Sequence, residues 1–499
     1  MTRGSPTPAV PRKTLRFGVA AAFVIAVGSG SACAPAIVPE GPRTAHEPAP
    51  GVTRDPAPRA ACDRWVAPNG DDHDPGTQAR PWATLAHAAA RVRDRGCTVW
   101  FEDGVYTRNT EPDRHFRTQT TFRAIHPYRA VIEGDGYVLD LSGSSHMTFS
   151  GFEFRHSGPG SSGIVVYVGG SEARHIAFRD NVFHDSYDDD ILKILDGARS
   201  VTVQDNVFYN QGPNEQHIDV NSVTDVRIEG NIFFNDFAAS GRGDPGDTKA
   251  YIVVKDSNEN DDRVLGASRI RIQRNVFLNW QGGLESFVKI GNDGKPYFEA
   301  RNVRIEDNLL IGNSSDEVHA PLGVSGAKGV SFVNNTVVGD LPSSSYAFHV
   351  DIKGENRRNE DILFANNIWS DPTRTMDEFS GGDPRNTVRL SLARNLYWNG
   401  GDPIPRGELL SPIDDARRVV RDPRLPEDQS DVILPIWDGA SFASGSRSIL
   451  DEFTRLVETY GAIPADSPAV GRALRSLASD RDILGHERDG HPDLGAFEA

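Results

Sequence analysis

The chain has 499 residues, and its 70 Asp and Glu against 53 Lys and Arg give a formal net charge of −17. This length exceeds what one ordinary compact core holds, which leaves either several domains or a repeat architecture that grows along one axis. The acidic balance argues against nucleic acid as a partner, and an acidic substrate would need positive charge concentrated locally.

Residues 1–33 have the pattern of an export signal. Four basic residues precede an apolar run at 18–28 that is too short to span a bilayer, and their removal would take the charge from −17 to −21. The segment Gly30-Ser31-Ala32-Cys33 resembles the lipobox of bacterial lipoproteins, whose cysteine carries a diacylglycerol anchor. Gly30 stands where that family has Leu or a similar residue, so plain signal-peptidase cleavage is the alternative. We therefore expect an exported protein, either extracellular or a cell-surface lipoprotein, whose contact with a membrane is limited to that anchor.

Residues 34–60 are rich in Pro and Ala without apolar periodicity, which predicts a flexible tether. Cys62 and Cys97 are the two remaining cysteines, and in an oxidising compartment we expect them to form a disulfide. Two buried free thiols are the alternative, and a zinc site would need further ligands.

Residues 61–98 are predicted to form an N-terminal cap. The segment from Pro81 to Arg95 carries Trp82, Leu85, Ala89 and Val92 at helical spacing and stops at Gly96. We expect a short amphipathic helix here that covers the first coil of a repeat domain, whose strand edges would otherwise be exposed.

Residues 99–400 contain the strongest signal, a repeat of β-branched alternation, a polar pair ending in Asn, and two or three apolar residues. Successive Asn residues are 25, 25, 44, 33, 27, 32 and 28 positions apart, at Asn181, Asn206, Asn231, Asn275, Asn308, Asn335, Asn367 and Asn395. Period-2 alternation within units of this length predicts an all-β solenoid, a single-stranded right-handed parallel β-helix. A propeller would need four strands per unit, for which most units are too short.

The Asn column has a structural explanation, because stacked coils place each Asn about 4.8 Å from the next, where side-chain amides can form a ladder. The 44-residue gap predicts inserted loops at 238–247 and 258–266. Insertions in a solenoid leave the stack and often flank the binding face.

The segment from Trp65 to Leu85 (WVAPNGDDHDPGTQARPWATL), the strand Val99–Tyr106 (VWFEDGVY) and the closing Pro492–Glu498 (PDLGAFE) resemble bacterial pectin-lyase-like right-handed β-helix proteins. The resemblance spans residues 63–499 and implies that 401–499 form a loop-rich extension and cap. It implies less about activity, because that superfamily contains lyases, hydrolases, epimerases and non-catalytic adhesins.

A second strand per coil brings polar residues together. Its inward pairs are Leu192/Ile194, Ile218/Val220, Ile252/Val254 and Val288/Ile290, so the residues between them and their neighbours two and four positions away should face outward. This predicts an outward set on four coils: Asp189, Lys193, Glu215, His217, Asp219, Asn221, Tyr251, Lys255, Glu285 and Lys289. The alternative explanation of such a set is a solvent-exposed polar face without a function.

The set is suited to a lyase that cleaves uronate-containing glycans by β-elimination. Lys289, Lys255 or Lys193 would be the base, and Tyr251 or His217 the acid. Asp219 would complete this group, Asn221 and Glu285 would bind substrate, and Arg242 in the insertion could supply the arginine that lyases of the alginate lyase and chondroitinase B type use.

Other chemistries stay open. Asp188, Asp189 and Asp190 with Glu215 offer the oxygen ligands of a calcium site. Glu215 with Asp189 could instead be the carboxylate pair of a β-helix glycoside hydrolase. A non-catalytic surface protein that only binds glycan is the third possibility. We expect a polysaccharide ligand in each case, and a monomer.

Overall fold

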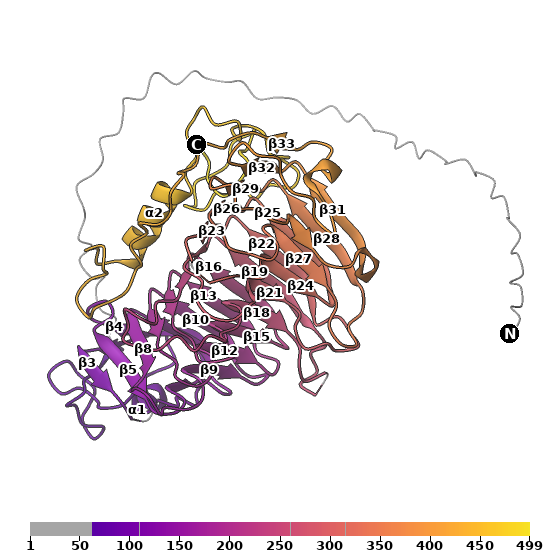
Figure 1. Ribbon diagram of the computed structural model, residues 1–499. Helices are drawn as coiled ribbons and strands as arrows, with labels where there is room; N and C mark the ends of the chain where they lie inside the picture. The colour runs from indigo at the N-terminus through magenta and orange to yellow at the C-terminus, as the bar shows by residue number, and fades with distance from the viewer. Residues whose placement is uncertain (1–61, 109, 260, 315) are drawn as a thin grey trace, which may run out of the picture. The chain divides into compact units, whose positions relative to one another are not determined.

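The computed structural model describes residues 62–108, 110–259, 261–314 and 316–499 (Figure 1). The predicted signal segment, Cys33 and the tether lie outside these residues. No helix among the described residues is long and apolar enough to cross a membrane.

The described residues form three parallel sheets. Sheet I has the strand order β1 (Arg64–Val66), β2 (Thr98–Phe101), β4 (His115–Ala124), β7 (Ser145–Ser150), β10 (Arg174–Arg179), β13 (Arg199–Gln204), β16 (Thr224–Glu229), β19 (Ala267–Gln273), β22 (Ala300–Glu306), β25 (Ala327–Val333), β28 (Asn359–Ala365) and β31 (Thr387–Ala393). Sheet II consists of β3 (Gly104–Tyr106), β5 (Ala130–Gly134), β8 (Phe152–His156), β11 (Val182–His184), β14 (Val207–Tyr209), β17 (Ile232–Phe234), β20 (Val276–Phe277), β23 (Leu309–Gly312), β26 (Thr336–Gly339), β29 (Ile368–Asp371), β32 (Leu396–Asn399) and β33 (Val419–Val420). Sheet III consists of β6 (Leu139–Asp140), β9 (Val166–Gly169), β12 (Leu192–Leu195), β15 (Ile218–Asn221), β18 (Ile252–Lys255), β21 (Ser286–Ile290), β24 (Ala320–Ser325), β27 (Phe348–Asp351) and β30 (Ser380–Gly381).

Each central coil contributes one strand to each sheet, and strands of successive coils pair in parallel, so the chain winds as a right-handed parallel β-helix. The predicted fold class is confirmed. Strand pairing runs from Arg64 in β1 to Val420 in β33, which extends the coil beyond the expected 99–400 at both ends.

The interior of the coil is filled by apolar side chains that stack from one turn to the next. Phe183, Phe208, Phe233 and Phe277 form one such column, with ring centroids 4.6, 5.2 and 5.0 Å apart. These residues are fully buried, and their stacking stabilises the register of successive coils.

The Asn column lies at the bend between sheets I and II and forms the expected ladder. From Asn181 to Asn395, each side-chain Nδ2 donates to the Oδ1 of the next Asn at 2.8–3.2 Å. The residue before each Asn has φ between 53° and 69°, which turns the chain at this corner. The polar pair in the repeat is therefore a turn signal.

The N-terminal end carries helix α1 (Leu85–Arg91), which is shorter than the expected Pro81–Arg95. Its buried Leu85, Ala88 and Ala89 belong to the interior core, and Thr84 caps it by accepting a hydrogen bond from the His87 amide. Cys62 and Cys97 form a disulfide that encloses this helix.

The C-terminal extension packs on the outer face of sheet II. Helix α2 (Ile449–Tyr460) buries Phe453, Leu456 and Val457 in a second apolar cluster with outward residues of sheet II such as Ile232 (Figure 1). Two short 3-10 helices, η1 (Pro384–Asn386) and η2 (Pro412–Asp414), complete the helical elements of the described residues.

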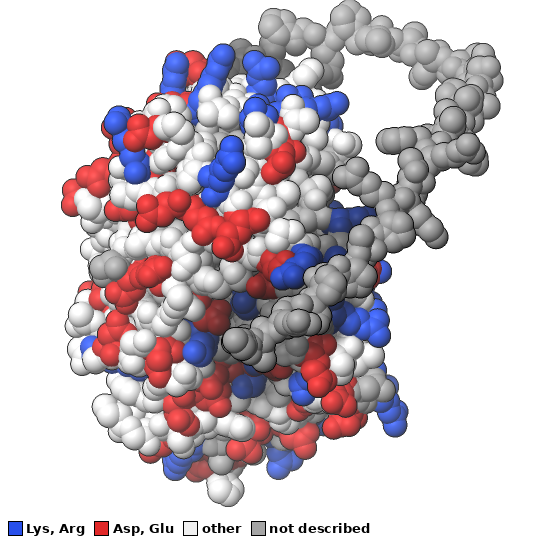
Figure 2. Space-filling model, turned by 45° about the vertical axis from the view of Figure 1, so that its right-hand side comes forward, with Lys and Arg blue, Asp and Glu red and all other residues white. Residues whose placement is uncertain are grey.

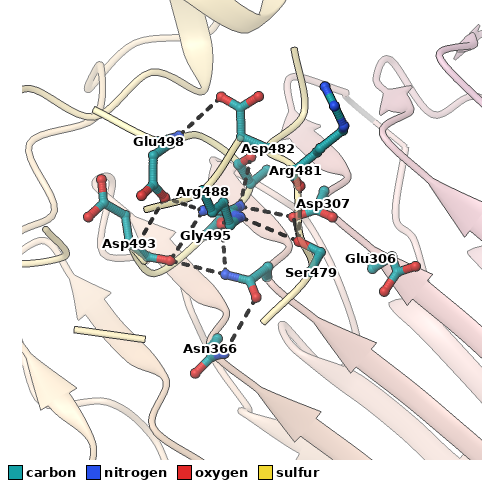
Figure 3. Close-up of polar contacts among 12 residues, drawn as sticks. Glu306, Asp307, Asn366, Ser479, Arg481, Asp482, Arg488, Asp493, Gly495 and Glu498 are labelled. Carbon is teal, nitrogen blue, oxygen red and sulfur yellow. Dashed lines mark hydrogen bonds and ion pairs between the residues drawn. The ribbon is translucent and has the colours of Figure 1, made fainter. Parts of the chain in front are cut away.

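Arg488 fastens the end of the chain to the coil. Its guanidinium contacts Asp307 of the sheet I to sheet II bend at 2.9 Å and Glu498 at 2.7 Å, and it donates to the Gly495 carbonyl at 2.8 Å (Figure 3). Burial raises the pKa of Asp307 to about 7, although Arg488 opposes the shift.

Candidate functional site

The outer face of sheet III holds part of the predicted polar set. Strand register places Lys193 beside Asp219, Asp219 beside Val253, and Val253 beside Lys289. The alignment made from the inward apolar pairs is therefore confirmed. Asn221 faces Lys255 in the adjoining column, so this lysine needs no shift of register to join the face.

Lys193 lies within a cluster of acids, of which Asp190 and Asp219 are buried. Its Nζ is 2.8 Å from Asp190 Oδ2, 3.5 Å from Asp189 Oδ1 and 3.6 Å from Asp219 Oδ2. Burial alone would lower the pKa of Lys193, but Asp190 and Asp219 raise it above its ordinary value. This lysine is therefore held as an ammonium ion and is a poor base.

Lys255 is held in the same way. Its Nζ is 3.4 Å from Asp219 Oδ2 and 3.8 Å from Asp293 Oδ1. Burial favours the neutral amine, but the two carboxylates prevail and raise the pKa of Lys255. Asp219 lies between the two lysines, with its side chain 1% exposed.

Asp189, Asp190 and Glu215 bring carboxylate oxygens within 4.8 Å of one another. Calcium takes six to eight oxygen ligands, whereas Asp190 already accepts from the Gln216 amide at 2.9 Å and faces the Lys193 ammonium. This donor set does not fit calcium, because Lys193 supplies the positive charge. Asp188 is not among the three acids whose oxygens come together, and it accepts a hydrogen bond from the Gly163 amide.

Glu215 has an acidity suited to proton transfer near neutral pH. Burial and the neighbouring Asp189 raise the pKa of Glu215 to about 7. Its carboxyl is thus protonated in a substantial fraction of molecules at neutral pH.

Lys289 differs from the other two lysines. It is 9% exposed, and no ion pair or hydrogen bond of its side chain occurs among the described residues. Burial lowers the pKa of Lys289, with Glu285 opposing the shift and Lys353 adding to it. Among the three predicted base candidates, Lys289 is the one whose neutral amine is favoured.

The space around Lys289 is shaped by the next coils. Gly323 follows it in register, and a Cβ there would come 2.8 Å from Lys289 Cδ, so the lysine side chain lies across this glycine. Beyond Gly323 the column continues to His349, whose ring centroid is 4.1 Å from that of His319. Burial lowers the pKa of both histidines, and that of His349 falls to about 4.

His319 and His349 were missed because the outward alignment stopped at Lys289. The signal was present, since the same register extended by two coils reaches Gly323 and then His349. His319 stands four residues before Gly323, as Glu285 stands four before Lys289, and the His319 amide donates to the Glu285 carbonyl at 2.8 Å.

His217 and Tyr251 do not belong to the outer face, which corrects their assignment as acids. Both are fully buried, and their rings stack inside the coil with centroids 4.4 Å apart. His217 contacts Asn235 Oδ1, and the Tyr251 hydroxyl donates to the Asn279 carbonyl. Each residue lies just before its strand, at a corner where two consecutive side chains turn inward, so the period-2 rule fails there.

Asn221 and Arg242 hold the inserted loops. Asn221 Nδ2 donates to Ser257 Oγ at 2.7 Å. The Arg242 guanidinium donates to the carbonyls of Ser186 and Asn210, both at 2.8 Å, and lies over the Tyr187 ring. These loop contacts occupy the Arg242 side chain, and its role in substrate binding stays a prediction.

Comparison with known proteins agrees with the fold. The structure of pectate lyase Pel9A superposes with a TM-score of 0.51 at 15% identity, covering 87% of this chain and 96% of that one. The chain shares its fold with this pectate lyase. The complex of XylC with xylose gives a TM-score of 0.49 at 12% identity, over 87% of this chain and 98% of that one.

Sequence comparison reaches less far. The chain is 30% identical over 131 residues to the uncharacterized protein YwoF of Bacillus subtilis (strain 168), which is 23% of this chain and 27% of that relative. The chain thus spans about a quarter of the length of the curated relative it matches. No protein-family model matches it.

Proposed function

We propose that the protein is a polysaccharide lyase that cleaves uronate-containing glycans by β-elimination on the outer face of sheet III, with Lys289 as the base. The observation that carries this proposal is the position of Lys289, buried beside His319 and His349 without a carboxylate in ion-pair contact among the described residues. A lysine whose pKa is lowered by burial is neutral in a larger fraction of molecules than an ordinary lysine, and the neutral amine can accept a proton.

The reaction requires one proton acceptor and one returned proton. The neutral Lys289 amine takes the proton on the carbon next to the uronate carboxylate, and the electron pair of that C–H bond forms the new C=C bond. The bond from the adjacent carbon to the glycosidic oxygen breaks. That oxygen takes the proton back from the Lys289 ammonium, which restores the enzyme, so the buried Tyr251 and His217 are not needed.

The acidity of the abstracted proton depends on neutralising the uronate carboxylate. Lys353 is exposed and close enough to Lys289 to lower its pKa. In our proposal the Lys353 ammonium pairs with the substrate carboxylate and is a binding residue. Lys193 and Lys255 are already paired with Asp190, Asp219 and Asp293, so we do not assign the substrate carboxylate to them.

The shared fold with pectate lyase Pel9A supports this proposal only as analogy, because one fold serves many activities. We also propose that the protein is exported. The Cys62–Cys97 disulfide supports an oxidising compartment, which agrees with the signal pattern of residues 1–33.

The experiment compares the parent with Lys289→Ala on a panel of uronate-containing and neutral polysaccharides. Unsaturated-uronate absorbance and reducing ends are both measured. We expect the parent to release both products together on a uronate glycan, and Lys289→Ala to lower turnover about 100-fold or more. Lys328→Ala on sheet I, where the lysine pairs with Glu360, is the matched control. A parent that binds glycan and releases neither product would make this a binding protein.

A glycoside hydrolase is the second candidate, favoured by Glu215 and Asp189. Their carboxylate oxygens come within 4.8 Å of each other, close to the separation of about 5 Å in retaining enzymes. With a pKa of about 7, Glu215 would be the acid and Asp189 the nucleophile. In that case Glu215→Gln abolishes reducing-end release, and no ultraviolet-absorbing product forms.

A further inference from the structure

A row of arginines lies on the outer face of sheet I, away from the site on sheet III. Arg227 of β16, Arg271 of β19 and Arg304 of β22 are exposed and in direct register. Neighbouring strands are about 4.8 Å apart, so the three side chains cover about 10 Å along the coil axis. Like charges directly opposite one another in a sheet are destabilising, and the fold itself gives no reason for this row.

The row is only partly neutralised. Arg304 pairs with Glu306 at 2.6 Å, and Arg227 is 3.8 Å from Glu229. Arg271, the central member, has no ion pair among the described residues. The positive charge is therefore greatest in the middle of the row, on a protein whose net charge is −17.

The arginines also line a depression. A hollow of about 490 Å³ is bounded by the row and by Arg269, with Asp225 as its one acidic lining residue. A second hollow of about 390 Å³ shares Arg271 and Arg304 with it and extends to Arg481 of the C-terminal extension. Its lining is mixed in charge, with four arginines and the acids Glu306, Asp307 and Asp480, so the positive charge is concentrated in the first hollow. Together they make a groove longer than a compact ion requires.

We propose that this groove is a second glycan-binding site, which takes a segment of an anionic polysaccharide whose carboxylates or sulfates pair with Arg227, Arg271 and Arg304. Guanidinium groups suit both anions, because their paired N–H donors match planar and tetrahedral oxyanions. An extended polyanion running along the row would contact one arginine per coil and relieve their mutual repulsion. The proposal extends the proposed function, since such a site would hold the same class of polymer that the face of sheet III cleaves.

The same surroundings make a small phosphate or a neutral sugar a poor occupant. A single ion would meet one or two of the arginines and leave the remaining repulsion in place. A neutral glycan would gain no charge complementarity from the row. Figure 2 shows many acidic side chains among the basic ones on the face in view, and the protein as a whole carries excess negative charge. A local row of arginines therefore stands out as a site for anions.

The test measures direct binding rather than cleavage. Polygalacturonate, dextran sulfate and unmodified dextran are titrated into the parent, the Arg227→Gln/Arg271→Gln/Arg304→Gln variant and Arg179→Gln, all on a Lys289→Ala background. Arg179 is an exposed arginine of the same sheet that lies outside both hollows. We expect the triple variant to lose at least tenfold in affinity for one or both polyanions and to bind with a weaker salt dependence, and Arg179→Gln to match the parent.

The two polyanions distinguish a carboxylate ligand from a sulfate ligand. Equal binding by the triple variant and the parent would overturn the proposal. It would also be overturned if duplex DNA or anionic vesicles bound through the arginines while neither polygalacturonate nor dextran sulfate bound. The Arg271→Gln single variant gives the same test with one substitution. If the parent cleaves no glycan yet binds through the row, the proposed lyase activity fails and this inference stands.

Discussion

Lys289 and Gly323 face each other in register on β21 and β24, and the lysine side chain lies across the glycine. A Cβ at Gly323 would come 2.8 Å from Lys289 Cδ and 2.8 Å from Ser286 Oγ. The missing side chain of Gly323 thus sets the position of the amine.

Gly323→Ala should displace Lys289 with little effect on the fold, because the clash is with a flexible side chain. We expect turnover to fall about tenfold, since catalysis depends on the placement of the reacting group to within about 1 Å. Gly134→Ala, in strand β5, is the control because its added Cβ meets nothing closer than 3.9 Å. If Gly323→Ala kept both its turnover and its melting temperature, Lys289 would not be the base.

Lys193→Ala should act on stability more than on chemistry. The substitution leaves Asp190 and Asp219 buried without their shared cation, and losing one partner of a buried pair costs about 3 kcal/mol. Chemical denaturation measures the loss. Lys328→Ala removes a half-exposed pair with Glu360 and should cost under about 1 kcal/mol. Equal losses in the two variants would contradict the structural role of Lys193.

The repeat made the fold and the register of Lys193, Asp219 and Lys289 predictable, because a period of 2 within each strand and one Asn per coil fix which residues are stacked. Which lysines form ion pairs was not predictable. Asp190 lies in the loop before β12, and only the folded chain brings its carboxylate to Lys193 and leaves Lys289 without one. His217 and Tyr251 were misassigned because the corner before each strand breaks the alternation.

His217 should make the protein less stable in mild acid. Burial lowers the pKa of His217 from 6.5 to about 3. Between these values the unfolded chain binds the proton and the folded chain does not, so stability is lost as the pH falls below 6.5, by about 1.4 kcal/mol per pH unit. We expect the free energy of unfolding, measured by denaturation, to fall between pH 7.5 and pH 5 by about 2 kcal/mol less in His217→Gln than in the parent. Identical dependence would show that His217 is not buried as the neutral ring.

Cys33 provides a test of anchoring. If it carries lipid, the full-length protein expressed with its signal should partition into detergent, and Cys33→Ser should move it to the aqueous phase. Cys62→Ser is the control. It removes the Cys62–Cys97 disulfide and leaves Cys33 in place, so we expect partitioning to stay unchanged. Aqueous partitioning of the parent would favour plain cleavage of the signal.

The dependence of kcat/KM on pH identifies the base through its neighbours. Because Lys289 must be neutral to accept the proton, kcat/KM should rise with pH and level off above a pKa that burial has lowered from the ordinary 10.5. Glu285 opposes that lowering and Lys353 reinforces it. Glu285→Gln removes a charge that favours the ammonium, so the rising limb should move to lower pH.

Lys353→Gln removes a charge that disfavours the ammonium, so the limb should move to higher pH, together with a larger KM if Lys353 pairs with the uronate. Opposite shifts from two single-charge changes cannot arise from a general loss of stability, because such a loss would lower activity at every pH. A hydrolase using Glu215 would instead keep its limb near pH 7 in both variants, since the pKa of Glu215 is raised by burial and by Asp189 rather than by these residues. Shifts in one common direction would contradict Lys289 as the base.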